Sequence, residues 1–184
     1  GGSSAGAADQ NITKLTVGYA TMESDQNGAY QWSKTAVKSH EEKEIDHEDG
    51  SKTFLITIEI NPGLKFSDGT EVKAANYVAQ ILSFSTLVSV GAKHTGQTGQ
   101  SFVGFDAFHA YDGTNDGVVV DEKSGLKASK AFSGIRLLGD YKFSMEVSAD
   151  YYPYYYADTY GAVTPDPLGL ALGDGIEVKD DGNG

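Results

Sequence analysis

Residues 112–117 (DGTNDG) have side chains of the types that coordinate calcium. An EF-hand loop needs Asp or Asn at its third position and a bidentate Glu at its twelfth. This chain has Thr114 and Lys123 at those positions, with Glu122 one residue early. Asx-turns, in which Asp and Asn side chains accept bonds from the nearby backbone, explain the same residues without a metal. We therefore expect a turn here and no calcium site.

A second group of potential metal ligands occupies residues 40–49 (HEEKEIDHED). On an extended strand His40, Glu42 and Glu44 share one face. Zinc sites instead bring His and Cys together from several elements, and the chain contains no cysteine. A charged strand face in contact with water is the simpler interpretation, so we predict no metal here.

Catalytic and nucleotide-binding motifs are missing from the sequence. There is no Gly-x-Ser-x-Gly elbow, and residues 96–99 (GQTG) lack the length and the lysine of a P-loop. With 26 Asp and Glu residues a glycosidase-like pair could arise by chance, but nothing distinguishes one pair from another. The sequence predicts neither an enzyme nor a bound cofactor.

Aromatic residues give the best binding feature that residue types alone offer. Residues 151–156 read YYPYYY, and Tyr160 follows. Such amphipathic rings can stack on sugars or pack against peptides, which makes Tyr154 and Tyr155 candidate binding residues. Packing of alternate rings at the edge of the core is the favoured alternative. Trp32, the single tryptophan, is a further candidate, as a ligand anchor or as a plug of the sheet edge.

Composition limits the class of partner. The chain has 184 residues, a formal net charge of −12 and a pI near 4.6. That balance repels nucleic acid and anionic membranes, and it favours a soluble monomer. A hydrophobic content of 39% excludes general disorder and is enough for one core.

Two antiparallel hairpins must position these residues. Strands over residues 36–46 and 51–60 flank an Asp49-Gly50 turn, which is a strong hairpin signal. Alternating apolar residues place one face of the second strand in the core. A second hairpin is predicted over residues 131–138 and 141–148, joined by Gly139-Asp140 in a primed turn with glycine at positive φ.

Helices are expected between and after the hairpins. Residues 74–86 carry an apolar stripe at helical spacing, as in a helix lying on a sheet. Shorter helices are predicted near residues 101–108 and 149–156. The sequence therefore predicts an α+β fold with a mostly antiparallel sheet, two hairpins and a few packed helices.

The ends of the chain differ in composition from the middle. Residues 1–10 (GGSSAGAADQ) predict a flexible linker or tag, and residues 173–184 (GDGIEVKDDGNG) a flexible, acidic, Gly-rich tail. Residues 11–172 are expected to form one α+β subdomain. The longest apolar segment, residues 77–90, is interrupted by serines and shorter than the roughly 20 residues that a bilayer requires, so no direct membrane insertion is predicted.

Several motifs together resemble one family. Residues 62–75 (PGLKFSDGTEVKAA) follow the strand of the first hairpin, residues 132–143 (FSGIRLLGDYKF) contain the turn of the second, and residues 151–156 supply an aromatic segment. In this order they resemble the family 5 extracellular solute-binding proteins, the peptide-capturing components of bacterial ABC importers. The resemblance spans residues 12–172 and is confined to the additional N-terminal subdomain of that family.

The resemblance implies a part of a larger protein. Its expected partners are the remaining lobes of a parent solute-binding protein and, through the parent, an oligopeptide and an ABC permease. It implies an extracellular, cell-surface location with a lipoprotein anchor supplied outside this chain. No ligand-binding residue of the family can be assigned to a numbered position here, so the chain is expected to be structural. A secreted carbohydrate-binding module that uses residues 151–160 is the alternative.

Overall fold

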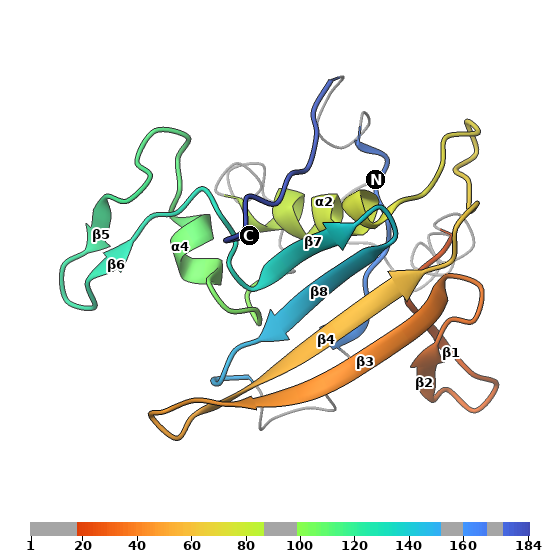
Figure 1. Cartoon of the computed structure of the whole chain (residues 1–184), viewed down its shortest axis with the longest axis horizontal. Helices are drawn as coiled ribbons and strands as arrows, with labels where there is room; N and C mark the ends of the chain where they lie inside the picture. Colours follow the sequence, from red (N-terminus) through yellow and green to blue (C-terminus); the bar gives the residue numbers. More distant parts are fainter. Residues whose placement is uncertain (1–17, 87–98, 152–159, 169–174) are drawn as a thin grey trace.

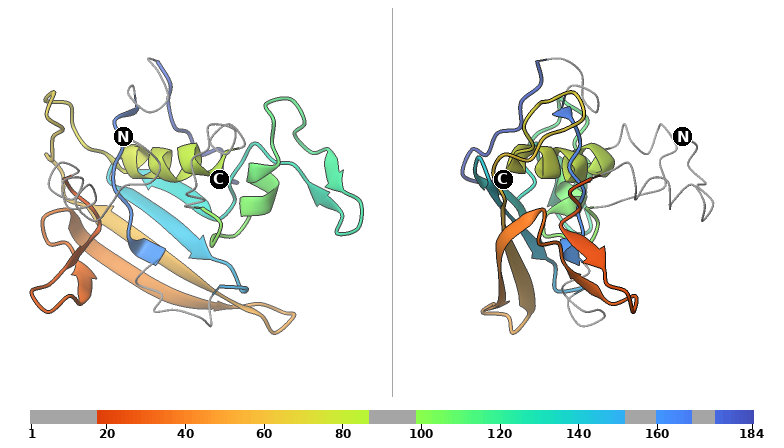
Figure 2. Two further views of the ribbon diagram at one scale, coloured as in Figure 1. Left: turned by 180° about the vertical axis from the view of Figure 1, so that it is seen from behind. Right: turned by 90° about the vertical axis from the view of Figure 1, so that its right-hand side faces the viewer.

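The protein has an α+β fold whose main sheet contains four antiparallel strands in the order β3-β4-β8-β7 (Figure 1). The computed structural model describes residues 18–86, 99–151, 160–168 and 175–184. One long helix, α2, lies against one face of the sheet (Figure 2). The predicted fold class is therefore confirmed.

The first predicted hairpin is confirmed in position and register. Strand β3 (Val37–Asp46) pairs antiparallel with β4 (Lys52–Ile60), and Gly50 adopts a φ of 81° in the turn. In the second half of β4 every second side chain is buried, with Ile56, Ile58 and Ile60 completely enclosed, while Phe54 of the same row is half-buried. Full burial of such a side chain contributes about 1.5–3 kcal/mol, so this row fixes the register of the sheet.

The second predicted hairpin is also present, but its turn was predicted wrongly. Strand β7 (Ile135–Gly139) pairs antiparallel with β8 (Lys142–Val147), and Gly139 lies opposite Lys142. The two linking residues are thus Asp140 and Tyr141, and neither they nor Gly139 has a positive φ. A register shift between Leu137 and Gly139 accommodates the reversal, since a bulge adds the local twist that a primed turn would otherwise provide.

Helix α2 (Ala74–Ser85) closes the core over the sheet, as its apolar stripe predicts. Tyr77, Val78 and Ile81 are buried, and the ring of Tyr77 stacks on Phe143 of β8 with 5.4 Å between centroids. The Tyr77 hydroxyl donates to the carbonyl of Tyr19 at 2.6 Å. Burial raises the pKa of Tyr77, so this group stays protonated and serves as a fixed donor.

Three smaller elements surround this body. A two-stranded hairpin of β1 (Met22–Ser24) and β2 (Tyr30–Trp32) lies near one end of β3, and a second one of β5 (Val119–Asp121) and β6 (Leu126–Lys127) projects from the opposite side (Figure 1). Helix α4 (Phe105–His109) lies between β6 and α2. It is shorter than the helix predicted near residues 101–108, because residues 99–104 form backbone bonds to β8 instead.

The C-terminal residues differ from the flexible tail that their composition predicts. Asp180 forms a bidentate ion pair with Arg136, at 2.7 and 3.0 Å, and accepts a bond from the Leu137 amide at 3.0 Å. Val178 packs against the core. Because β7 is an edge strand with amides free to bond, residues 178–182 find partners that no local sequence feature reveals.

Candidate functional site

The two motifs of the family resemblance meet in space. Tyr141, in the β7–β8 turn, donates to Glu71 at 2.7 Å, and Lys73 forms an ion pair with Asp140 at 2.9 Å. The backbone amide of Ala74 also donates to the Asp140 carbonyl. These polar groups bond to one another, so the contact joins the start of α2 to the second hairpin.

The KFSDGT segment itself is a tight turn. Thr70 donates its amide and its hydroxyl to Asp68, at 2.9 and 2.6 Å, and Gly69 adopts a φ of 88°. These bonds lower the pKa of Asp68. The ring of Phe66 packs against the core. This segment is thus a scaffold, as its residue types suggested.

Trp32 has the environment of a plug at the sheet edge. Its indole nitrogen donates to Glu42 at 3.2 Å, and its ring stacks on His40 with 4.6 Å between centroids. Gly161 lies directly against the ring: a Cβ at residue 161 would come within 3.2–3.3 Å of two ring atoms and closer to a third. Both the ring and its donor are therefore engaged within the chain, and Trp32 does not present a free stacking surface.

Tyr154 and Tyr155 lie outside the described residues. Of the aromatic segment only its two flanking members are described, and both Tyr151 and Tyr160 are half-buried and pack against the core. The Tyr160 hydroxyl donates to the Tyr151 carbonyl at 3.2 Å. For these two rings the packing role is the one observed.

The potential metal ligands are used in turns and strand contacts. Asp112 accepts bonds from the amides of Thr114 and Asn115, as in an Asx-turn, and these bonds lower its pKa. Glu44 on β3 pairs with Lys52 of β4, and His47, just after β3, contacts Thr53 at 2.9 Å. Within the described part of the chain no group of three or more His, Asp or Glu side chains could hold a metal ion.

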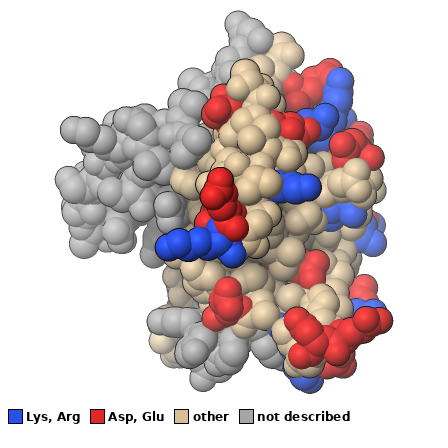
Figure 3. Space-filling view, turned by 90° about the vertical axis from the view of Figure 1, so that its left-hand side faces the viewer, with Lys and Arg blue, Asp and Glu red and all other residues tan. Residues whose placement is uncertain are grey.

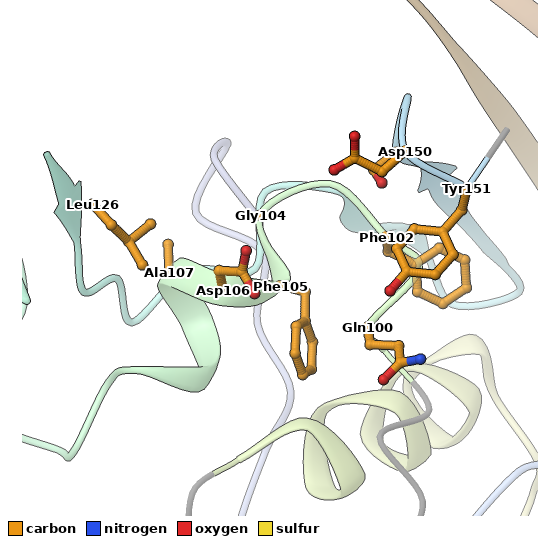
Figure 4. A pocket seen from close by; sticks show the side chains of 10 residues that line it. Gln100, Phe102, Gly104, Phe105, Asp106, Ala107, Leu126, Asp150 and Tyr151 are labelled. Atoms are coloured by element: carbon orange, nitrogen blue, oxygen red, sulfur yellow. The ribbon is translucent and has the colours of Figure 1, made fainter. Parts of the chain in front are cut away.

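A pocket of about 400 Å³ lies where the aromatic segment begins, at Tyr151 (Figure 4). It lies between α4, residues 99–104 and the end of β8. The amide of Val103 donates to the Glu146 carbonyl at 2.9 Å, and that of Ser148 to the Ser101 carbonyl at 2.8 Å. These backbone bonds hold the loop beside β8 and so fix two walls of the pocket.

Gly104 sets the angle at which α4 leaves this loop. Its φ is 83°, and a Cβ there would approach the Ser133 amide to 3.2 Å and its hydroxyl more closely still. Only glycine combines that dihedral with such close backbone approach. The third wall of the pocket, made by α4, is therefore positioned by the contact between residues 104 and 133.

The pocket is lined by both polar and apolar groups. Phe102 and Phe105 are buried, and Leu126 of β6 completes the apolar side. Figure 4 shows Asp150 and Tyr151 together on one side and Asp106 on the α4 side. No lysine or arginine lines it. Such a lining can hold a small group that is apolar along its length and polar or cationic at one end.

Sequence reasoning singled out only Tyr151 among the residues of this pocket. The lining comes from three separate parts of the chain, residues 100–107, 126 and 148–151. No motif links these segments, because the pocket depends on backbone bonds between the loop and β8. A run such as Ser101–Phe105 carried no pattern from which the site could have been found.

On the face that Figure 3 shows, acidic and basic side chains of the described residues are interspersed and form no continuous basic area. No helix in the described ranges is long and apolar enough to cross a membrane.

Comparison with known proteins gives structural similarity only. Neither a protein-family model nor a curated protein matches the sequence. The chain is similar to the solved structure of Haemophilus influenzae OppA in complex with the peptide RPPGFSPFR, at 16% identity and a TM-score of 0.56. It is also matched to the oligopeptide-binding protein AppA from Bacillus subtilis, bound to a nonapeptide, at 14% identity and a TM-score of 0.46.

Each match covers nearly all of this chain but a small share of the solved structure. The match with OppA covers 93% of this chain but 29% of the OppA chain, and the match with AppA covers 94% of this chain but 26% of the AppA chain. The chain therefore spans less than a third of the length of either structure. The OppA match shows that the chain shares a fold with part of that structure.

Proposed function

We propose that this chain is one subdomain of an extracytoplasmic solute-binding protein that delivers oligopeptides to an ABC importer. The observation that carries the proposal is the OppA match, in which nearly the whole of this chain superposes on less than a third of a peptide-binding protein. The parent would supply the other lobes, the peptide cleft, the contact with the permease and a lipoprotein anchor at the cell surface. The chain itself would be monomeric and without catalytic activity.

Within that parent the role of the chain is structural. The residues of both signature motifs bond to one another, through Glu71 with Tyr141 and Lys73 with Asp140. Trp32 likewise donates its indole hydrogen bond to Glu42 and stacks its ring on His40, both within the chain. Side chains engaged in this way support a scaffold, while a peptide cleft needs backbone and side-chain groups left open to an extended ligand.

The carbohydrate-binding alternative has less support. Its proposed platform, residues 151–160, includes Tyr154 and Tyr155, which lie outside the described residues. The two rings that are described, Tyr151 and Tyr160, pack against the core. A stacking platform needs rings with a free face, so we do not propose this function.

Two observations test the proposed function. The gene sequence on either side of this segment should encode a lipobox cysteine upstream and the remaining lobes downstream; flanking sequence of an unrelated domain type would refute the proposal. The isolated chain should also show no binding, by calorimetry, of capped oligopeptides that lack Lys and Arg, at concentrations up to about 1 mM, which corresponds to about 4 kcal/mol. Micromolar binding would contradict a structural role.

A further inference from the structure

The pocket between α4 and the end of β8 has a charge pattern that the proposed function does not use. The inference drawn from it is independent of that function. Most aspartates in the described part of the chain accept a hydrogen bond or an ion pair, as Asp68, Asp112 and Asp180 do. Asp106 and Asp150 have no such partner there, and both line the pocket.

Apolar rings lie beneath these two carboxylates. Phe102 and Phe105 line the pocket and are 4% and 7% exposed, so each offers it a small accessible surface. Tyr151 adds a third ring on the side of Asp150 (Figure 4). Aromatic faces attract cations, most strongly where water is excluded. The rings and the carboxylates thus favour the same kind of ligand for separate physical reasons.

We propose that this pocket binds a guanidinium or ammonium group carried on an apolar stem. The stem packs on Phe102 and Phe105, and the cation lies between Asp106 and Asp150. The volume of about 400 Å³ suits one side chain of the size of arginine or lysine, or a short polyamine. A neutral sugar could use the rings and Gln100, but it would cover two carboxylates without supplying a counter-charge, which costs free energy.

Titration with butylguanidinium, followed by two-dimensional amide NMR of the full chain, tests the proposal. We expect shifts confined to residues 100–107 and 148–151, with a dissociation constant on the order of 1–10 mM, as for a ligand of so few atoms. Butylurea, a neutral molecule of the same shape, should cause no such shifts. Affinity should fall as ionic strength rises, because exposed charges are screened.

Matched variants locate the site. Asp106→Asn and Asp150→Asn should each weaken binding about fivefold, the effect of one exposed charge. Glu23→Gln removes the same charge in β1, which lies at the opposite end of β3 from the β3–β4 turn and the end of β8, and should leave affinity unchanged. The spectra themselves report whether each variant is folded.

Other outcomes overturn the proposal or refine it. Equal binding of butylurea, shifts outside the pocket, or unchanged affinity in both Asp variants would refute a cation site. Tighter binding of a neutral glycan would replace it with a carbohydrate site. Comparison of N-acetyl-arginine-N-methylamide with spermidine then identifies the source of the cation: the peptide group is favoured if the first binds more tightly, and a free polyamine if the second does. Neither result changes the test of the proposed function, which uses peptides without Lys or Arg.

Discussion

At Trp32 three residues from different parts of the chain fit one another closely. Glu42 accepts the indole hydrogen bond, His40 stacks on the ring, and Gly161 leaves room for it. Thr21 fixes the position of Gly161 by donating to its carbonyl at 2.5 Å. Trp32, with its indole nitrogen and its ring engaged in this way, is a packing residue. Its position requires a glycine at residue 161, because a Cβ there would overlap the ring.

Gly161→Ala should displace the Trp32 ring. The added methyl group overlaps the indole in a packed site, which costs about 1–3 kcal/mol of unfolding free energy. We expect a red shift of Trp32 emission in the folded state and a lower midpoint in urea. Gly139→Ala is the matched control, because a Cβ there meets nothing within 4 Å and the φ is not left-handed. Unchanged emission in Gly161→Ala would show that the ring is not held by this contact.

Asp180 gives a pH-dependent contribution to stability. Its bonds to Arg136 lower its pKa from an ordinary value of 3.8 to about 2, and its side chain is 10% exposed. A lowered folded-state pKa stabilises the protein above the unfolded value, and that stability is lost as the pH falls from about 4 toward 2. Because Arg136 is about one-third exposed, solvent screening reduces the contribution to about 1–2 kcal/mol.

Asp180→Asn should therefore lower the unfolding free energy by about 1–2 kcal/mol at pH 7. In urea titrations at several pH values, the difference in unfolding free energy between Asp180→Asn and the unsubstituted chain should shrink as the pH falls from 4 to 2. Glu177→Gln, which removes a charge from the same segment at an exposed pair with Lys179, should show no such pH-dependent difference. Equal unfolding free energies for Asp180→Asn and the unsubstituted chain at pH 7 would refute the role of this ion pair.

At the scale of elements, α2 is joined to the rest of the chain at its first turn. Asn76 accepts a bond from the Lys73 amide at 2.7 Å and donates to the Asp166 carbonyl at 3.0 Å. It thus caps the helix and holds residues 160–168 against it. Burial raises the pKa of Asp166 in that segment. Farther along α2, the Oε1 atom of Gln80 is buried without a hydrogen bond to any described residue.

Asn76→Ala should lower the unfolding free energy by about 2–3 kcal/mol, because it removes a cap and leaves a buried carbonyl unpaired. Gln80→Ala, on the same helix, should have little effect or stabilise slightly, since its buried oxygen has no bond to lose. Denaturant titrations of the two variants measure the contrast. A smaller loss for Asn76→Ala than for Gln80→Ala would mean that residues 160–168 are not held through this side chain.

At the scale of the whole molecule, the sheet has one covered face and one polar face. Helix α2 covers the first (Figure 2), and antiparallel sheets commonly leave the second in water. Its two edge strands are protected differently. Charged residues occupy most of β3, which discourages pairing with another chain. The edge of β7 is covered instead by the C-terminal residues, through Asp180.

Removal of residues 175–184 should expose the edge of β7 to other molecules. We expect concentration-dependent association in light scattering, because an open strand edge is a template for pairing. Asp180→Asn should stay monomeric, as most of the covering segment remains. A truncated chain that is monomeric at every concentration would show that β7 needs no cover.

The sequence by itself determined the local elements of this protein. Apolar residues alternate along residues 52–60, which predicts a strand, and recur at helical spacing along residues 74–85, which predicts a helix. Both can be read from one segment, because the spacing of the buried side chains follows from its secondary structure. The sequence also determined the absence of familiar catalytic motifs and suggested a family resemblance, of which the OppA match bears on the fold alone. The turn of the second hairpin was missed, because a bulge at residues 137–139 depends on both strands.

Only the tertiary structure decided which residues meet. The pocket, the Trp32–Gly161 contact and the Arg136–Asp180 ion pair each join segments that are far apart in the chain. Their formation depends on backbone bonds and close approaches that no single segment encodes, such as those of Val103 with Glu146 and of Gly104 with Ser133. For that reason the calcium-like loop and the tyrosine run attracted attention in the sequence, while Asp106 and Asp150, which share a pocket, did not.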